Sequence, residues 1–395
     1  MKPLLTRACR TALALALALW AAGASAAERA SNLVNVRDYG AKGDGVHDDT
    51  SAIQAAINAV AERGAGVVYF PYAKGGYRLA SPAPEMVDGK PCRSQLYVPA
   101  RQSLNICFRG ELPCTLLHPY GVSKRFGTQD RINTFLFSDW KPPVETNAAA
   151  RPWSMLSVLP GWTSKDYPLN HSLVTIESLE FRAYLDKDLM CAVQSGANLQ
   201  DSAEAVVRDS QFALNDQIGD VVLKKELTFG DCHAAGLIMS GELNDQQIVH
   251  DVNVQGFKYG IVMAEHTYGN YIYLHDNQYA LTFTGSAHLS KIDFVTAQMN
   301  QCILCVPDWN LFGRGCGPES IVPVNVTVDH ASIEDGENSR PRACRLAYGV
   351  YDPNNRLRGR ISYYEMGFGS YPRPFKVVGA KRFRLCPHGY DGKGN

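Results

Sequence analysis

Residues 34–58 read VNVRDYGAKGDGVHDDTSAIQAAIN, and this stretch carries the strongest fold signal in the chain. Val34, Val36 and Tyr39 suggest a short apolar strand, and the glycines that follow permit a tight loop. Ser51 and Gln54 have the spacing of a capping box, after which apolar residues recur at helical spacing. We therefore predict a helix that covers the open end of a solenoid, followed by another strand at residues 67–71.

The loop also contains three carboxylates, at Asp44, Asp48 and Asp49. They could be read as a metal cluster, but loop turns and a helix N-cap explain them without a metal. The sequence indicates no cofactor, and calcium is possible without any motif that indicates it.

This opening resembles the N-terminal segment of the pectate-lyase-like superfamily, whose members include polygalacturonases, alginate epimerases and phage depolymerases. The resemblance implies an all-β fold, a right-handed parallel β-helix, and a polysaccharide substrate. It does not name the reaction. The Asn-Thr-Asp, Gly-His-Gly and Arg-Ile-Lys motifs of polygalacturonases, the Asp-Pro-His-Glu of alginate epimerases and the Arg-x-Pro-x-x-Arg of calcium pectate lyases are all missing. No catalytic residue is therefore carried over by motif.

The middle of the chain carries a repeat. If Gly236, Gly260, Ala280 and Cys302 are equivalent, the intervals are 24, 20 and 22 residues, and an apolar run follows each marker. Coils of this length with two or three short strands are typical of a parallel β-helix. An ordinary β-sandwich is the alternative, but the period and the opening segment disfavour it.

Residues 1–26 have the pattern of a signal peptide, with a basic start, an apolar centre and an Ala24-Ser25-Ala26 cleavage site. We predict one β-helix domain over 27–395, with an N-terminal cap (27–75), loop-rich insertions (80–168) and a C-terminal cap or tail (336–395). The protein is expected to be periplasmic or secreted.

The chain has 39 basic and 39 acidic side chains, and loss of Lys2, Arg7 and Arg10 leaves 36 against 39. Such a balance gives no basic excess for nucleic acid, and a polyanionic substrate would need a local basic patch. We expect no membrane insertion after the signal peptide, and the oligomeric state, monomer or trimer, stays open.

Of the eleven cysteines, ten follow the signal peptide, and an even number in an exported protein suggests disulfides. The Cys302-x-x-Cys305 spacing alone is weak evidence for zinc or redox chemistry.

Aligning the coils on the repeat markers predicts stacked carboxylates. Glu242 falls six residues after its marker, while Glu265 and His266 fall five and six after theirs. Asp216 lies about one coil earlier. Carboxyls about 5 Å apart suit a retaining glycosidase and wider pairs an inverting one, so Glu242, Glu265, His266 and Asp216 are the candidate catalytic residues. Solvated turn residues are the alternative reading.

Substrate contacts are expected from aromatic rings that stack on sugars and from charged groups near the carboxylates. In a lyase, His266 or Tyr268 could be the base, and Lys258 or Arg314 could neutralise a uronate. The candidate substrate-binding residues are Asp220, Lys258, Tyr268, Tyr271, Trp309 and Arg314.

We therefore expect an exported enzyme that cleaves a polysaccharide, with a glycoside hydrolase favoured. A polysaccharide lyase or uronate epimerase is the nearest alternative. A non-catalytic glycan-binding or envelope-assembly protein on the same scaffold is the third.

Overall fold

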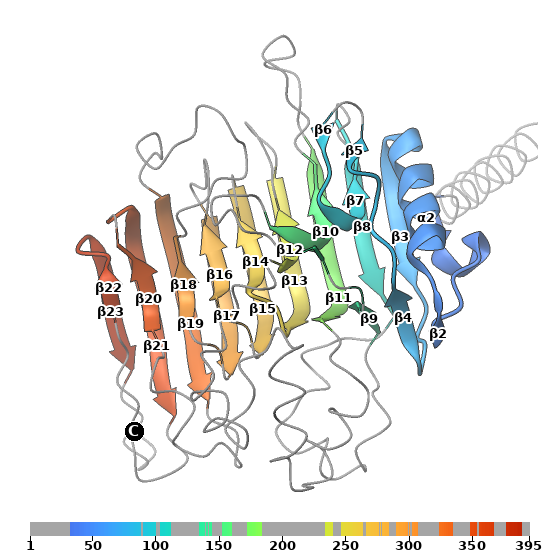
Figure 1. Ribbon diagram of the computed structural model, residues 1–395. Coiled ribbons are helices and arrows are strands. Elements are labelled where there is room, and N and C mark those ends of the chain that lie inside the picture. The colour runs from blue at the N-terminus through green and yellow to red at the C-terminus, as the bar shows by residue number, and fades with distance from the viewer. Residues whose placement is uncertain are drawn as a thin grey trace, which may run out of the picture.

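The computed structural model describes a solenoid of parallel strands (Figure 1). The described residues are 32–87, 90–99, 103–111, 134–138, 140, 142–143, 152–159, 172–183, 234–239, 246–263, 266–275, 277, 279–283, 290–298, 300, 302–306, 324–334, 348–353, 355–366 and 377–388.

Two parallel sheets run along the solenoid. The first is ordered β1 (Leu33–Asn35), β3 (Ala65–Phe70), β8 (Asn105–Gly110), β11 (Leu173–Ala183), β13 (Gln246–Gln255), β15 (His266–His275), β17 (Ser290–Gln298), β19 (Val324–Glu334), β21 (Leu357–Met366) and β23 (Phe383–His388). The second is ordered β7 (Ser94–Val98), β10 (Trp153–Val158), β12 (Ala234–Met239), β14 (Tyr259–Met263), β16 (Tyr279–Phe283), β18 (Cys302–Cys305), β20 (Tyr348–Asp352) and β22 (Val377–Gly379).

From β10 onward, successive strands alternate between the two sheets, so each pair of strands makes one coil. Three short strands, β2 (Asp44–Asp48), β4 (Gly76–Leu79) and β9 (Phe135–Ser138), extend the first sheet at its N-terminal end. β5 (Met86–Val87) and β6 (Lys90–Pro91) form a small antiparallel pair. The predicted right-handed parallel β-helix is confirmed, and β7 to β10 show that residues 80–168 also supply coil strands as well as loops.

The strands β11, β13, β15 and β17 of the first sheet each bend at one residue in the left-handed backbone region. These residues are Ser178, Asp251, Tyr271 and Phe294, with φ between 48° and 54°. The residues on either side of each bend stay paired with the neighbouring coil, so the bends lie in line. Each of these coils therefore has a first limb before the bend, a second limb after it, and a strand of the second sheet.

The repeat reflects a packing constraint at the start of the second-sheet strands. A Cβ atom on Gly236 would lie 2.5 Å from Cγ1 of Val254, so this inward position has no room for a larger side chain. The predicted alignment of Gly236 with Gly260 and Ala280 is confirmed by the pairs on either side.

The fourth marker was wrong by one residue. Cys302 pairs with Tyr279, so the residue aligned with Ala280 is Ile303 and the last interval is 23. Ile303 is buried in the core cluster at this place, which shows that the later coil accommodates a large side chain where the earlier ones require a small one.

An asparagine ladder holds the turns between the second limb and the second sheet. The Asn277 side chain accepts a hydrogen bond from the Phe257 N–H at 3.0 Å and donates to the Val254 carbonyl at 3.0 Å. Asn300, one coil later, accepts from the Asn277 N–H at 2.9 Å and donates to the Leu274 carbonyl at 2.7 Å. These bonds tie the turn residues Phe257 and Asn277 to the neighbouring coils and satisfy buried backbone groups.

We predict that Asn277→Ala lowers the free energy of unfolding by about 2–4 kcal/mol, because it leaves two buried backbone groups unsatisfied. Urea unfolding followed by circular dichroism measures this. Asn105→Ala, at an exposed strand position, is the matched control and should change stability by less than about 0.5 kcal/mol. Equal losses in the two variants would contradict the ladder's role.

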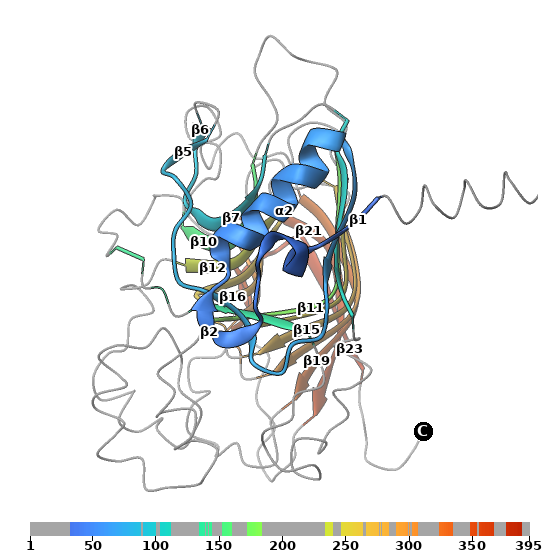
Figure 2. The ribbon, with the colours of Figure 1, turned by 90° about the vertical axis from the view of Figure 1, so that its right-hand side faces the viewer.

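The N-terminal end of the solenoid is covered by α2 (Thr50–Arg63), which lies across the coils in Figure 2. Ile53, Ile57 and Val60 are fully buried against the core. The helix ends at Gly64, which adopts the left-handed conformation with φ 77°. The predicted cap helix is thus present.

Two local predictions for this end were wrong. β1 stops at Asn35, and Val36–Tyr39 form a 3-10 turn closed by Gly40 with φ 102° instead of continuing the strand. The capping box is also absent, since Asp49 is the N-cap residue. Gln54 instead exchanges two hydrogen bonds with the backbone of Tyr97 on β7, at 2.9 and 3.0 Å, because tertiary contact offers this amide a donor and an acceptor together.

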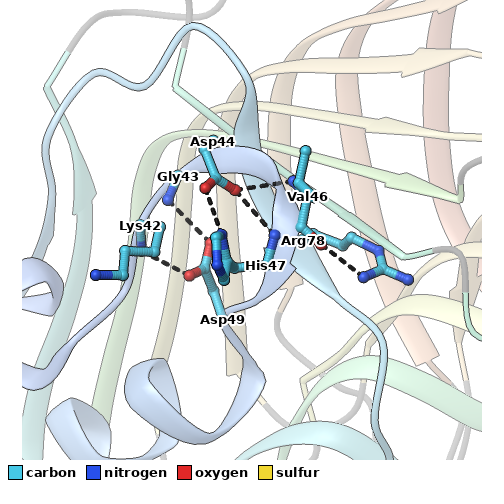
Figure 3. Close-up of polar contacts among 7 residues, drawn as sticks. All are labelled: Lys42, Gly43, Asp44, Val46, His47, Asp49 and Arg78. Carbon is cyan, nitrogen blue, oxygen red and sulfur yellow. Dashed lines mark hydrogen bonds and ion pairs between the residues drawn. The ribbon is translucent and has the colours of Figure 1, made fainter.

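The loop carboxylates bind backbone amides, as loop chemistry predicts (Figure 3). Asp49 accepts hydrogen bonds from the Lys42 and Gly43 N–H groups at 2.6 and 3.0 Å. Asp44 accepts from the N–H groups of Val46 and His47, both at 2.9 Å. These contacts fix the loop against the cap helix.

The two carboxyls titrate differently because their surroundings differ. Hydrogen bonds from the backbone of His47 and Val46 lower the pKa of Asp44 to about 2. Burial raises the pKa of Asp49, although the two loop amides oppose that effect. The loop therefore contains one carboxyl whose pKa is lowered, Asp44, next to one whose pKa is raised, Asp49.

We predict that Asp44 makes the N-terminal loop acid-sensitive. Its pKa is about 2 in the fold and 3.8 in the unfolded reference, so its stabilising contribution is present above pH 3.8 and is lost as the pH falls toward 2. Asp44→Asn should flatten the dependence of urea stability on pH in that window. Asp38→Asn, at an exposed position nearby, is the control and should leave the slope unchanged. An unchanged slope in Asp44→Asn would contradict the assignment.

Among the described residues, no helix is long and apolar enough to cross a membrane. Cys114, Cys191, Cys232, Cys316 and Cys344 lie outside the described residues, so disulfide pairing stays a prediction.

Candidate active-site face

Chemistry-bearing side chains are divided unequally between the two sheets. The second-sheet strands β10, β12, β14, β16 and β18 contain no Asp, Glu, His, Lys or Arg. In contrast, the first-sheet strands β13, β15 and β17 together contain three His, two Asp and one Lys. Among these strands, the charged and imidazole side chains that commonly transfer protons are therefore confined to the first sheet.

These groups lie in two outward rows on the first limbs. Tyr268 pairs with Ile248 on one side and Lys291 on the other, and Asn270 pairs with His250 and Asp293 in the same way. Neighbouring strands are separated by about 4.8 Å. We call the polar side chains of these rows, together with His266 at the start of β15, the polar face. Its members are His250, His266, Tyr268, Asn270, Lys291 and Asp293.

A phenol and a cation lie side by side on this face. Tyr268 is 44% exposed, and Lys291, its register neighbour, is also exposed. Lys291 Nζ is 3.3 Å from Oδ2 of Asp293. An ammonium group therefore lies on the coil next to that of Tyr268.

His266 is held at the start of β15 by a buried polar ladder. The next residue, Thr267, is buried and donates its hydroxyl to Oε1 of Gln247 at 3.3 Å. The Thr267 N–H also donates to the Ser290 hydroxyl at 3.4 Å. Side chains two apart on a strand share a face, so this ladder fixes the place from which His266 and Tyr268 both project.

Aromatic rings line the bend next to the polar face. Tyr271 and Phe294 stack with centroids 5.1 Å apart and planes 8° apart, and the His250 ring meets Tyr271 edge-on at 5.8 Å. One ring face of Tyr271 is therefore occupied by Phe294. Tyr273 lies beyond the bend, where burial raises its pKa.

The structure separates some of the predicted site residues. Lys258 precedes β14 and His266 follows it, so these residues lie at opposite ends of a second-sheet strand. Nζ of Lys258 is 5.6 Å from the centroid of the Tyr259 ring. His266, Tyr268 and Tyr271 lie together on β15, whereas Glu242, Glu265, Asp216, Asp220, Trp309 and Arg314 lie outside the described residues.

Glu242 belongs to the connection 240–245 and Glu265 to the connection 264–265. The first connection runs from Met239 to Gln246 and the second from Met263 to His266, and these end residues are register neighbours. The described residues that flank the two segments are therefore side by side.

Sequence reasoning missed Lys291, Asn270 and Asp293. The signal that could have found them is the strand period of two, which places Asn270 on the face of Tyr268. The coil intervals then assign Lys291 and Asp293 to the next coil. The one-residue error at Cys302 does not affect this assignment, because it concerns the other sheet.

The N-terminal part of the chain is similar to known proteins. A family model described as "Rhamnogalacturonase A/epimerase, pectate lyase-like" matches residues 33–87. Alginate lyase 7 of Azotobacter vinelandii is 56% identical over 55 residues, which are 14% of this chain and 6% of the lyase. Plasmin and fibronectin-binding protein A of Streptococcus pneumoniae is 62% identical over 39 residues, which are 10% of this chain and 5% of that protein.

The chain therefore spans only a small fraction of the length of these curated relatives. A solved structure, the family 28 exopolygalacturonase of Yersinia enterocolitica, aligns with 92% of this chain and 67% of its own at 12% identity and a TM-score of 0.36.

The matched segment coincides with the capped N-terminal end of the solenoid. It is the opening segment of the pectate-lyase-like superfamily, and the coils that follow have the parallel β-helix architecture which the resemblance implied.

We predict that Tyr271 acts mainly in packing. Tyr271→Ala should lower the free energy of unfolding by about 1–2 kcal/mol, because it removes a stacked ring and its contact with His250. Tyr268→Ala, on the same strand and equally exposed at 44%, removes no such stack among the described residues and should change it by less than about 0.5 kcal/mol. Urea unfolding of both variants measures this, and the reverse order would contradict the assignment.

Proposed function

We propose that this protein acts on a uronate-containing polysaccharide by removing the proton beside the sugar carboxylate, at the polar face. The observation that carries the proposal is the pairing of Tyr268 with Lys291, with His266 two residues before Tyr268. A base, a hydroxyl and a cation are the groups that this reaction needs.

In the proposed reaction, Lys291 binds the sugar carboxylate and stabilises the negative charge that develops when the neighbouring proton leaves. His266 takes the proton from C5. For elimination, the electron pair forms a C4–C5 double bond, the C4–O4 bond breaks, and Tyr268 donates a proton to the departing oxygen. If C5 is instead reprotonated from the opposite side, the product is an epimer and the chain stays intact.

The comparisons support the substrate class more than the reaction. The N-terminal segment is similar to that of a protein named as an alginate lyase, and alginate is a polyuronate. That similarity covers the cap and not the polar face, so the proposal depends on the side chains of β15 and β17.

A glycoside hydrolase is the second candidate, and one observation favours it. The connections that contain Glu242 and Glu265 start and end at register neighbours. Carboxylates on adjacent coils would be close to the roughly 5 Å separation of retaining enzymes. In this mechanism Glu242 and Glu265 would be the catalytic pair, with His266 and Asp216 assisting.

A non-catalytic binding protein is the third candidate. The same N-terminal segment is shared with a protein named for binding plasmin and fibronectin. In this case the polar face would bind a glycan without changing it.

The first experiment incubates the purified protein with polyuronates and neutral polysaccharides, and follows unsaturated ends by absorbance, reducing ends by a colour assay and epimers by NMR. We expect unsaturated or epimerised product from a polyuronate. His266→Ala, Tyr268→Phe and Lys291→Met should each lower kcat/KM by about 10²–10⁴-fold. Tyr271→Phe, which keeps the stacked ring on the same strand, is the control and should stay within about twofold.

Other outcomes redirect the assignment. New reducing ends without unsaturation or epimers would contradict the proposal and favour the hydrolase. Glu265→Gln and Glu242→Gln should then abolish turnover, while Glu62→Gln on the exposed side of α2 should not. Binding without any product would contradict both enzyme assignments.

A further inference from the structure

Two tryptophans meet where the chain passes from the second limb to the second sheet. Trp140 comes two residues after the end of β9, which pairs with the second limb of β11, and Trp153 is the first residue of β10. Their ring centroids are 4.9 Å apart and their planes are 66° apart, which is an edge-to-face arrangement. We call these two residues the tryptophan pair. Within a coil, the second limb separates this corner of the solenoid from the first limb, so the pair is distinct from the polar face.

The edge-to-face geometry leaves indole faces that the partner ring does not cover. A ring that presents its edge keeps both faces, and the ring that receives the edge keeps one. The Tyr271–Phe294 stack differs, because its planes are only 8° apart and each ring covers a face of the other. On the next coil Trp153 pairs with Ala234, whose methyl group is too small to cover an indole ring.

Core packing does not account for the pair. Both indoles are partly exposed, whereas Pro142, Pro152 and Ser154, which are close to them in the chain, are buried. Neither ring belongs to the apolar clusters that the described residues form. Neither indole N–H has a hydrogen-bond partner within the part of the chain that the structure describes. Two partly exposed rings with unused donors are therefore suited to a ligand that has both an apolar face and hydroxyl groups.

The strands and prolines around the pair hold it in place. β9 pairs with β4 and β11, and β10 pairs with β7 and β12, so each strand beside the pair is fixed by two neighbours. Pro152 directly precedes Trp153. Pro142 and Pro143 follow Trp140 with one residue between. Proline restricts its own φ and the conformation of the residue before it. A surface that is rigid beforehand loses little entropy when a ligand binds.

We infer that the tryptophan pair is a platform on which a pyranose ring of the polysaccharide stacks, at a place separate from the reacting sugar. The choice of a polysaccharide rests on the proposed function. A pyranose has an apolar C–H face and hydroxyl groups at its edge, so an indole contacts the face while its N–H donates to a hydroxyl. This contact involves no charge, and it therefore holds a sugar ring with or without a carboxylate.

The first test uses a polyuronate whose carboxylates have been reduced to alcohols, because this neutral polymer reports stacking without charge. Titration calorimetry measures its binding to the full chain. Trp140→Ala/Trp153→Ala should weaken binding by about fivefold to tenfold, and the wild-type affinity should not change with salt. Trp140→Phe/Trp153→Phe keeps a ring at each place and should stay within about threefold of wild type. Tyr39→Ala removes an exposed ring at the N-terminal end and is the control, expected to bind as wild type.

A second measurement does not depend on the folding of a variant. Hydroxyl-radical footprinting of the wild-type chain, followed by mass spectrometry, compares the oxidation of each aromatic residue with and without the neutral polymer. Trp140 and Trp153 should be protected by at least about threefold, because a stacked sugar covers the ring face. Tyr39 should be oxidised equally in both samples. Circular dichroism checks the fold of each double variant.

Three results would overturn the inference. The first is that the wild-type chain does not bind the neutral polymer. The second is equal affinity of Trp140→Ala/Trp153→Ala and Tyr39→Ala for that polymer. The third is unchanged oxidation of both tryptophans when the polymer is bound.

Failure of the proposed reaction is recognised separately. Tyr268→Phe should lose turnover of a polyuronate and keep the protection of both tryptophans. If the wild-type protein makes no product but the polymer protects its tryptophans, the platform is supported and the proposed reaction is wrong. Product without protection of the tryptophans would support the reaction and contradict the platform.

Discussion

Coil-to-coil register is the constraint on which the rest of the structure depends. Each coil hydrogen-bonds to the next in both sheets, and a shift of one residue would turn core side chains outward. The bend between limbs is part of this register, because Asp251, Tyr271 and Phe294 all adopt the left-handed conformation at the same place. Such a conformation costs about 1–3 kcal/mol in a residue other than glycine. The Tyr271–Phe294 stack and the hydrogen bond from the Ser178 hydroxyl to Asp251 at 2.8 Å offset part of that cost.

A solenoid built this way has to close its ends. At the N-terminal end, α2 buries Ile53 and Ile57 on the first coils, and the preceding loop is held by Asp44 and Asp49 through backbone amides. The carboxylates therefore serve the cap. The cap also explains why the strongest sequence signal in the chain concerns architecture: a helix, a loop and a strand must meet at one place, and few sequences satisfy all three.

The sequence predicted the parts of the fold that depend on local pattern. The cap helix, the parallel β-helix and the equivalence of Gly236, Gly260 and Ala280 follow from periodicity and from side-chain size. The errors arose where tertiary contact decides. Gln54 bonds to the backbone of Tyr97 instead of capping its own helix, and Ile303 occupies a place where a small residue was expected. The candidate site was predicted less well because its members come from different coils, so Lys291 and Tyr268 become neighbours only through the register. Glu242 and Glu265 stay predictions.

The same register that builds the core also arranges the surface into rows, and these rows are not symmetric about Tyr268. On the C-terminal side the row continues through Lys291, Arg360 and Arg384. On the N-terminal side it continues through Ile248, Thr175 and Cys107, none of which carries a positive charge. Burial raises the pKa of Cys107 to about 12, so this thiol is neutral at physiological pH. The two ends of this row therefore differ in charge, and the difference is set by side chains that only the coil-to-coil register brings together.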